Sequence, residues 1–383
     1  MNIKAIREQI HSNPELGNQE FETSELIQSA LSAIDIPHVS MAGTGVVGLI
    51  DNGKPATLLL RADMDALPIQ ETTGLPFASK NNGVMHACGH DMHIAMLLGA
   101  AERLMQNRDK LNCNIKLVFQ PDEEGDGGAR RMIEQGVLEN PHVDAAIAFH
   151  VWPEFEYGTV GTKIGEMTAT CDEFEIVIKG KGGHVAKPQF TNNPITPAFE
   201  LGYRLKHLTV DFPHILDVTN INSGSGSPNV VPDIMTLSGS MRVAEPKLRT
   251  FIPELIKELC EEIEAKYDVS YVFTPKFQLQ YPPMVNDEQL TGYAEKVIKN
   301  HATTRRLERP YFIAEDFACF SEKAPSTLIL LGCCPPDRLG QNDLHQSDMM
   351  VDERTLQLGV DLFTDIAMNY CIDKIMQRQV CFR

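Results

Sequence analysis

The richest source of metal-binding chemistry in the sequence is MHACGHDMH, residues 85–93, where three histidines, one cysteine and one aspartate fall within eight positions. Cys88 and His90 flank a glycine, so both side chains can turn toward one point. Thiolate and imidazole are ligands that zinc and related ions accept. The alternative is a helix N-terminus capped by Asp91, with histidines that happen to be exposed. The density of potential ligands favours a metal site.

A second stretch, FQPDEEG at residues 119–125, places two adjacent carboxylates directly after an apolar run. In open α/β sheets, binding sites lie beyond the carboxyl ends of the strands. Glu123 and Glu124 could divide the work there: one ligates a metal, and the other stays free as a general base with a pKa set by burial and neighbouring charge. Acidic loops are common on protein surfaces, so this stretch is weak evidence by itself.

Three more stretches are weak individually. His150 follows an apolar run in AFHVWP, where a lone histidine is more often packed in a core, and His345 lies in the polar segment LHQSD before the last predicted helix. Asp63 and Asp65 emerge from an apolar strand in RADMDALP. Burying carboxylates there is unfavourable unless they are paired or lie near a cation. They could orient a ligand histidine or make only strand-end hydrogen bonds.

The elements that position these residues alternate between helix and strand in the first part of the chain, which predicts an α/β architecture. Apolar residues recur at helical spacing within residues 3–10, 26–34 and 93–106. Short runs that are apolar on both faces predict buried strands of a largely parallel sheet. These runs are residues 44–50, 57–62, 114–119 and 143–149.

The middle of the chain follows a different pattern. Residues 172–179 and 233–243 alternate apolar and polar side chains, which predicts antiparallel strands with one face toward solvent or a partner. Residues 247–266 show helical periodicity. This segment therefore indicates an α+β insertion.

The last part of the chain returns to the first pattern. The stiff tripeptide Tyr281-Pro282-Pro283 ends the insertion. A helix at 288–300, a buried strand at 327–331 and a final helix from about residue 352 follow it. We therefore expect a discontinuous α/β catalytic domain with a smaller lid inserted in it. The expected boundaries are residues 1–171 with 282–383 for the catalytic domain, and residues 172–281 for the lid.

Composition and charge exclude several classes of function. The 383 residues carry a net charge of −18 and have a pI near 5.1, so the surface repels nucleic acid and anionic membranes. No apolar run approaches the roughly 18 residues that span a bilayer, and the first fifteen residues hold no apolar segment of the kind a secretory signal needs. Nine scattered cysteines indicate reduced thiols rather than a disulfide framework. We expect a cytoplasmic protein.

Together with HSNPELG at residues 11–17, these stretches resemble, in order and spacing, the dinuclear metallopeptidase family of the aminoacylases and glutamate carboxypeptidases. They are most similar to its amidohydrolase branch, which includes hippurate hydrolases, auxin-conjugate hydrolases and N-acetyl-diaminopimelate deacetylases. The resemblance extends over nearly the whole chain. It implies a zinc-exopeptidase-like catalytic domain, with a mixed and largely parallel sheet and flanking helices, and a lid that carries a dimer interface.

The resemblance also implies two divalent metal ions per subunit, with Glu123 as the general base. The chain follows the amidohydrolase branch where that branch departs from the wider family. Asp63-Met64-Asp65 stands in place of a His-x-Asp, and the thiolate of Cys88 replaces the usual bridging carboxylate. These donor types suit manganese, zinc, cobalt or nickel and leave the choice open. The implied ligands are Cys88, His90, Glu124, His150 and His345.

The lid of such enzymes supplies groups that hold the substrate. His184, in the glycine-rich turn GKGGH, is similar to a histidine that stabilises the oxyanion, often from the other subunit of a dimer. Asn229 and Arg242 resemble groups that bind the substrate carboxylate, and Arg242 falls on the polar face of its predicted strand, where a guanidinium can bind a carboxylate bidentately. A surface turn and a solvated arginine are the alternatives. Glu315 and Asp316 match another signature of the branch, whose role is open.

The resulting hypothesis is metal-assisted hydrolysis of the amide bond in an N-acyl-amino acid or small peptide, by a homodimer joined through the lid. Lid closure would bring His184, Asn229 and Arg242 over the site. Aminopeptidase or carboxypeptidase activity uses the same chemistry and stays open. Two competing hypotheses are a nucleophilic Cys88 with a histidine base and a catalytically inactive metal-binding protein. Glu123 is not among the implied ligands, and a protein that only binds metal would not need it, so its presence favours an enzyme.

Overall fold

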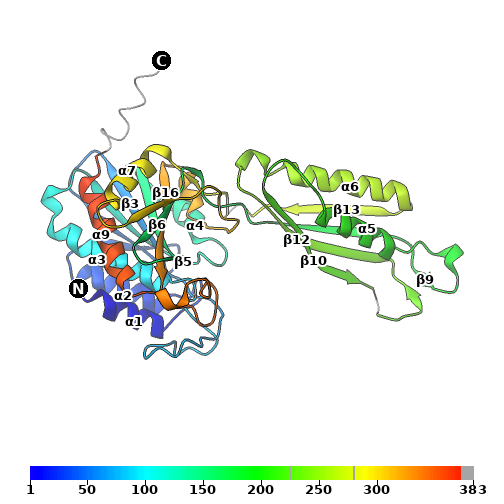
Figure 1. The fold of residues 1–383 in the computed structure, drawn as a ribbon, viewed down its shortest axis with the longest axis horizontal. Coiled ribbons are helices and arrows are strands. Elements are labelled where there is room, and N and C mark those ends of the chain that lie inside the picture. Colours follow the sequence, from blue (N-terminus) through cyan, green and yellow to red (C-terminus); the bar gives the residue numbers. More distant parts are fainter. Residues whose placement is uncertain (225, 279–280, 372–383) are drawn as a thin grey trace, which may run out of the picture. The chain divides into compact units, whose positions relative to one another are not determined.

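The chain folds into two compact units (Figure 1). The computed structural model describes residues 1–224, 226–278 and 281–371. The first unit holds Met1–Met167, Met284–Arg309 and the described chain from Asp316 onward, and the second holds Thr168–Pro283 and Pro310–Glu315. The boundaries expected from the sequence placed Pro310–Glu315 in the catalytic domain, whereas the chain returns to the second unit over these six residues.

A mixed, eight-stranded sheet forms the centre of the first unit. In spatial order its strands are β1 (His38–Met41), β2 (Gly45–Ile50), β4 (Asn114–Gln120), β3 (Thr57–Asp63), β5 (Ala145–Glu156), β16 (Ser326–Cys334), β6 (Thr159–Thr162) and β15 (Thr303–Arg306). The central strands β4, β3, β5 and β16 are parallel. Every residue of β3, β4 and β16 is buried, which explains why these strands are mainly apolar on both faces. The predicted mixed, largely parallel sheet is confirmed.

Helices pack against this sheet. They are α1 (Ile3–Ser12), α2 (Phe21–Ser32), α3 (His90–Gln106), α4 (Gly128–Glu134), α7 (Glu288–Ile298), α8 (Ala318–Ser321) and α9 (Arg354–Asn369). The central helix α3 contacts both α1 and α9. Gly99 permits this close approach, because a Cβ there would lie 2.7 Å from side-chain carbons of Ile3 and Val360. α3 begins at His90 rather than at residue 93, so that one candidate ligand lies on its first turn.

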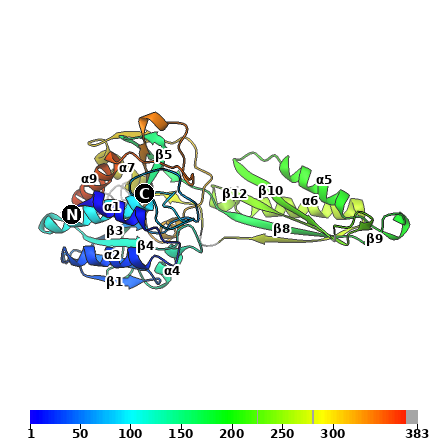
Figure 2. The ribbon, with the colours of Figure 1, turned by 90° about the horizontal axis from the view of Figure 1, so that it is seen from below.

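The second unit is a four-stranded antiparallel sheet with two helices. In spatial order its strands are β10 (His214–Ser223), β12 (Ile234–Val243), β8 (Asp172–Lys179) and β13 (Ser270–Lys276). Figure 2 shows α5 (Ile195–Lys206) and α6 (Phe251–Tyr267) side by side along this sheet. Alternate residues of β8 and β12 are buried against these helices, as the period-two pattern predicted. A two-stranded ribbon joins β9 (Gly183–His184) to β11 (Val230–Val231).

Two further observations concern the helices and the cysteines. None of the described helices combines the length and apolar character that crossing a membrane requires. The eight described cysteines are all free thiols. The described part of the chain therefore depends on packing and polar networks rather than on disulfides.

Candidate metal centre

Cys88 and His90 are brought to the site by the turn that begins α3. Gly89, the N-cap of α3, adopts a left-handed conformation with φ +80°. A Cβ at this position would lie 2.4 Å from Cγ2 of Val151 on β5. Glycine is therefore required both for the backbone conformation and for the close approach of β5. The turn buries the Cys88 thiol and the His90 ring.

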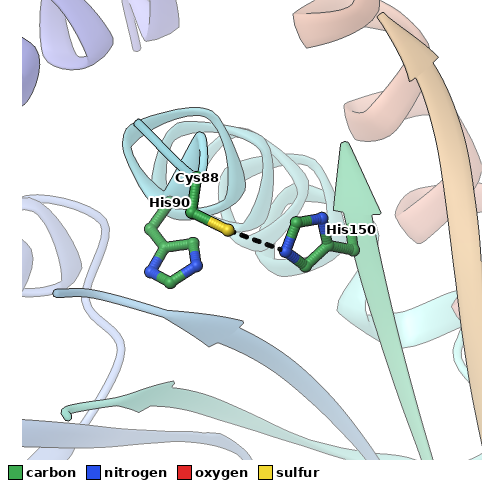
Figure 3. Close-up of side chains that lie close together, drawn as sticks. All are labelled: Cys88, His90 and His150. Atoms are coloured by element: carbon green, nitrogen blue, oxygen red, sulfur yellow. Dashed lines mark hydrogen bonds between the residues drawn. The ribbon is translucent and has the colours of Figure 1, made fainter. Parts of the chain in front are cut away.

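His150 approaches Cys88 from β5. Its Nε2 lies 3.4 Å from the sulfur of Cys88, and its Nδ1 lies 2.7 Å from the carbonyl oxygen of Val151. A carbonyl oxygen only accepts, so Nδ1 carries the proton and the lone pair of Nε2 faces Cys88. This is the tautomer that a metal ligand needs. Figure 3 shows the rings of His90 and His150 on either side of the Cys88 sulfur.

Glu124 and His345 form a second set of donors near the same thiol. Glu124 follows β4, and His345 lies in the loop between β16 and α9. Glu124 Oε1 and His345 Nε2 are 3.1 Å apart. The backbone N–H of His345 donates to the carbonyl oxygen of Ala87 at 2.8 Å, which ties this loop to the residue before Cys88.

Two groups of three donors therefore share one sulfur atom. Cys88 groups with His90 and His150, and again with Glu124 and His345; within each group the donor atoms lie within 4.8 Å of one another. The structure thus brings together all five residues expected to be ligands. Shared thiolate, imidazole and carboxylate donors of this kind fit a pair of divalent cations.

The surroundings of His90 provide an independent test of this fit. Both of its ring nitrogens are buried without a hydrogen-bond partner among the described residues. Buried polar atoms almost always have a partner, so these two mark a place for a bound group. Burial lowers the pKa of His90, but the carboxylates of Asp63 and Asp65 outweigh burial and raise it to about 10. Without a cation, a proton on His90 balances part of this negative charge.

Cys88 is poorly suited to act as a nucleophile by itself. Burial, reinforced by the charges of Glu124, Glu123 and Asp63, raises the pKa of its thiol well above the usual value. Nucleophilic cysteines need the opposite, a lowered pKa. Positive charge at the site would favour the thiolate, which agrees with a ligand role for Cys88.

Asp65 holds the backbone of the QPDEEG turn rather than a ligand histidine. Its Oδ1 accepts the N–H of Glu123 at 3.0 Å, and its Oδ2 accepts the N–H of Glu124 at 2.9 Å. The His90 ring is farther away, with Nδ1 3.4 Å from Asp65 Oδ1. Asp65 therefore positions two neighbouring carboxylates through their backbone.

Asp63 likewise binds partners other than a ligand. Its Oδ2 accepts a hydrogen bond from Arg61 Nη1 at 2.5 Å, and its Oδ1 lies 2.5 Å from His93 Nδ1. The nearest approach to His90 is 3.7 Å. The sequence left two roles open for the aspartates, orienting a ligand histidine or making only strand-end hydrogen bonds, and the hydrogen bonds of Asp63 go to Arg61 and His93.

Two buried networks beside the site were not anticipated from the sequence. Asp316 accepts hydrogen bonds from Arg61 Nη2 at 3.0 Å, Gln120 Nε2 at 2.8 Å and the N–H of Ala129 at 2.9 Å, which gives the second residue of the Glu315-Asp316 pair a structural role. A charged Arg61 within the apolar run LLLRAD was the available signal, because a buried guanidinium requires carboxylate partners.

The second network forms at the start of α3. Asp91 does not cap the helix; its Oδ2 accepts a hydrogen bond from Arg7 Nε at 2.7 Å and lies 2.9 Å from His11 Nδ1. His11 also lies 3.3 Å from Glu71 through its Nε2. This network anchors α1 and the loop after β3 to the turn that carries Cys88.

The second unit does not bring its three candidate substrate-binding residues together. His184 pairs with Val230 in the β9–β11 ribbon, close to Asn229, whose carbonyl oxygen accepts the N–H of Val185 at 3.1 Å. Arg242 lies near the opposite end of β12, where its Nη1 donates to the carbonyl oxygen of Phe312 at 2.9 Å. The strand β12 separates the two places by about 27 Å at ~3.4 Å per residue. Within the second unit, Arg242 therefore lies apart from His184 and Asn229.

The fold and the donor set define a class: a two-unit α/β protein that carries a candidate metal site around the sulfur of Cys88. The chain belongs to Peptidase family M20/M25/M40, which it matches over residues 59–369. This confirms the resemblance found in the sequence motifs.

Individual relatives agree with this assignment. The chain is 37% identical to Thermostable carboxypeptidase 1 of Saccharolobus solfataricus, over 93% of this chain and 92% of the relative. It is 36% identical to N-acetyl-L-cysteine deacetylase of Bacillus subtilis, over 92% of this chain and 84% of the relative. A solved structure of a dinuclear metal-binding M20 peptidase from Bacillus subtilis matches with a TM-score of 0.85 and 33% identity, covering 96% of each chain.

Proposed function

We propose that this protein hydrolyses the amide bond of N-acyl-amino acids with the help of two divalent metal ions. The observation that carries the proposal is the sharing of Cys88 by two groups of donors, one with His90 and His150 and the other with Glu124 and His345. The relationship to a deacetylase of N-acetyl-L-cysteine and to a dinuclear metal-binding peptidase supports it.

The bound ions would supply Lewis-acid polarisation of the amide carbonyl and a lowered pKa for a water molecule. The chain itself supplies the proton transfer. Glu123 belongs to neither of the donor groups that share Cys88, and Asp65 fixes its backbone beside that of Glu124. Its carboxylate would accept a proton from the attacking water molecule and deliver it to the leaving nitrogen.

The donor set limits the metal without identifying it. One thiolate, three imidazoles and one carboxylate suit zinc, and the same imidazoles and carboxylate also suit manganese, cobalt and nickel. The distinction depends on coordination number and supply in the cell. We therefore propose a divalent transition metal and leave the element to measurement.

The second unit is proposed to join two subunits. The strand β10 is an edge strand whose only sheet neighbour is β12 among the described strands, and α5 packs along it with Phe199 and Tyr203 exposed one helical turn apart. Pairing of two β10 strands around a twofold axis would cover the edge and both aromatic side chains. The distance between His184 and Arg242 supports the family arrangement in which the histidine serves the site of the other subunit.

A carboxypeptidase activity is the second candidate, because of the 37% identity to Thermostable carboxypeptidase 1. Both reactions need a group that binds the carboxylate of the amino acid. The two differ in whether the group on the other side of the amide bond is a simple acyl group or a further residue. Arg242 is the proposed carboxylate-binding residue in either case.

A substrate panel tests the proposal directly. The purified protein is treated with a chelator, reloaded with Mn²⁺, Zn²⁺, Co²⁺ or Ni²⁺, and assayed on N-acetyl-amino acids, N-benzoyl-amino acids and dipeptides. We expect hydrolysis of the acylated amino acids to disappear with the chelator and to return with at least one ion. Activity that survives complete metal removal contradicts the proposal, and cleavage of dipeptides alone favours the carboxypeptidase.

A further inference from the structure

His93 belongs to the ligand-rich stretch MHACGHDMH, yet both of its ring nitrogens already have partners within the protein. Nδ1 lies 2.5 Å from Oδ1 of Asp63, and Nε2 accepts a hydrogen bond from the backbone N–H of Val151 at 2.8 Å. The ring is buried. With both nitrogens engaged, His93 has no lone pair to offer a cation.

The hydrogen bonds fix the tautomer of His93. A backbone N–H can only donate, so Nε2 is the unprotonated nitrogen and Nδ1–H donates to Asp63. The other oxygen of Asp63 accepts from the guanidinium of Arg61, which is itself held by Gln120 and Asp316. Arg61, Asp63 and His93 therefore form a buried chain of hydrogen bonds, which we call the Arg61–Asp63–His93 chain.

The Arg61–Asp63–His93 chain ends on the backbone N–H of Val151, which needs an acceptor. Among the described strands, β3 pairs with β5 only as far as Arg61 opposite Ala148, while β5 continues to Glu156. Beyond Ala148 this side of β5 has no neighbouring strand among those described. The N–H of Val151 would be buried and unsatisfied there, and the His93 ring provides its acceptor.

The same residue of β5 also fixes the orientation of a candidate ligand. The carbonyl oxygen of Val151 accepts the Nδ1–H of His150 at 2.7 Å, and this hydrogen bond aims Nε2 of His150 at Cys88. Val151 is thus held between two imidazoles, one on its N–H and one on its carbonyl oxygen. A shift of this backbone would move His150 Nε2 away from the site.

We propose that His93 is a positioning residue for metal binding: it holds the Val151 backbone, and through it the direction of His150 Nε2. This inference rests on the proposed function, in which His150 is a ligand. It predicts a selective effect, since His150 belongs to only one of the two donor groups that share Cys88. Loss of His93 weakens the ion held with His90 and His150 and spares the one held with Glu124 and His345.

Two variants of nearly equal length and volume test the acceptor itself. His93→Gln keeps an oxygen that can accept the N–H of Val151, and His93→Met does not. Metal-free wild type and both variants are titrated with Co²⁺, followed by visible absorption and by the metal retained after dialysis. We expect about two ions per chain for the wild type and for His93→Gln. For His93→Met we expect about one ion, with the second bound about 10–100-fold more weakly.

The outcomes separate this inference from the proposed function. A wild type that does not bind two ions contradicts the proposed function. A wild type that binds two ions, with His93→Met and His93→Gln binding two equally well, overturns the inference alone. If His93→Met does not fold, ¹⁵N chemical shifts of histidine-labelled, metal-free wild type decide. An unprotonated Nε2 on His93 supports the proposal that this nitrogen accepts the N–H of Val151, and a protonated Nε2 overturns it.

Discussion

Oδ2 of Asp65 accepts a hydrogen bond from the backbone N–H of Glu124 at 2.9 Å. Asp65 follows β3 and Glu124 follows β4, two parallel neighbours whose carboxyl ends meet at one edge of the sheet. Because Oδ1 of Asp65 also accepts the N–H of Glu123, a single carboxylate sets the position of a candidate ligand and of the proposed general base.

Asp65→Asn should therefore lower both metal binding and turnover. The amide has one oxygen, so it can accept only one of the two N–H groups, and its own N–H₂ opposes the other. We expect kcat/KM and metal affinity each to fall about 10–100-fold. Steady-state kinetics and dialysis measure the two effects. Asp51→Asn, at an exposed position, is the control, and equal behaviour of the two variants would contradict the assignment.

Glu123→Gln should separate metal binding from catalysis. The amide keeps the size of the side chain and cannot take up a proton, so kcat should fall about 10²–10⁴-fold, the typical contribution of a general base. Metal content should remain at the wild-type value. Glu124→Gln is the matched comparison one residue away and should lose metal as well. A Glu123→Gln variant with normal kcat would assign the proton transfer to another group.

Metal affinity should rise with pH. In the metal-free protein, Asp63 and Asp65 outweigh burial and hold the pKa of His90 at about 10, and burial raises the pKa of the Cys88 thiol. Both groups are protonated near neutrality and must lose a proton when they become ligands. The association constant should therefore gain up to about two logarithmic units per pH unit on the acid side of both pKa values.

Calorimetry in buffers of different ionisation enthalpy measures this proton release directly. We expect about two protons to be released when the group of Cys88, His90 and His150 binds its ion. Zn²⁺ binding without proton release near neutral pH would show that Cys88 and His90 are not both ligands.

Charge on the exposed face of α5 should disrupt the proposed dimer. Tyr203 is 67% exposed, and Tyr203→Lys places two ammonium groups near the twofold axis that would pair the β10 strands. We expect a monomer by light scattering coupled to size exclusion. Phe21→Lys is the control, since Phe21 is equally exposed on α2 of the first unit. A dimer that withstands Tyr203→Lys would place the interface elsewhere.

The five candidate ligands were named because their motifs resemble those of a known family, and the fold explains why these residues meet. Glu124 follows β4, and parallel strands bring such residues to one edge of a sheet. His150 lies inside β5, just beyond the last residue of that strand that pairs with β3. Cys88 and His90 are two residues apart around Gly89, which adopts a left-handed conformation in the structure. Local spacing and strand order made each stretch a candidate, and the family resemblance joined them into one set.

The polar partners of the candidate ligands were harder to predict from the sequence. Whether Asp63 binds His90 or His93 depends on differences of about an ångström, which arise where β3 stops pairing with β5. The pairing of Asp91 with Arg7 joins residues 84 positions apart, and no local pattern encodes it. His184 lies near the start of β12 and Arg242 near its end. Which residues lie near each end depends on how the strands pair, and the alternation within one strand does not specify that pairing.

The two donor groups differ in their access to water. The His345 side chain is 50% exposed and that of Glu124 16%, whereas His90 is fully buried. An ion on the exposed side can exchange without opening the protein, but one between His90 and His150 must wait for a local fluctuation of the sheet edge. Removal by a competing chelator should therefore proceed in two kinetic phases, with the fast phase belonging to the His345 side.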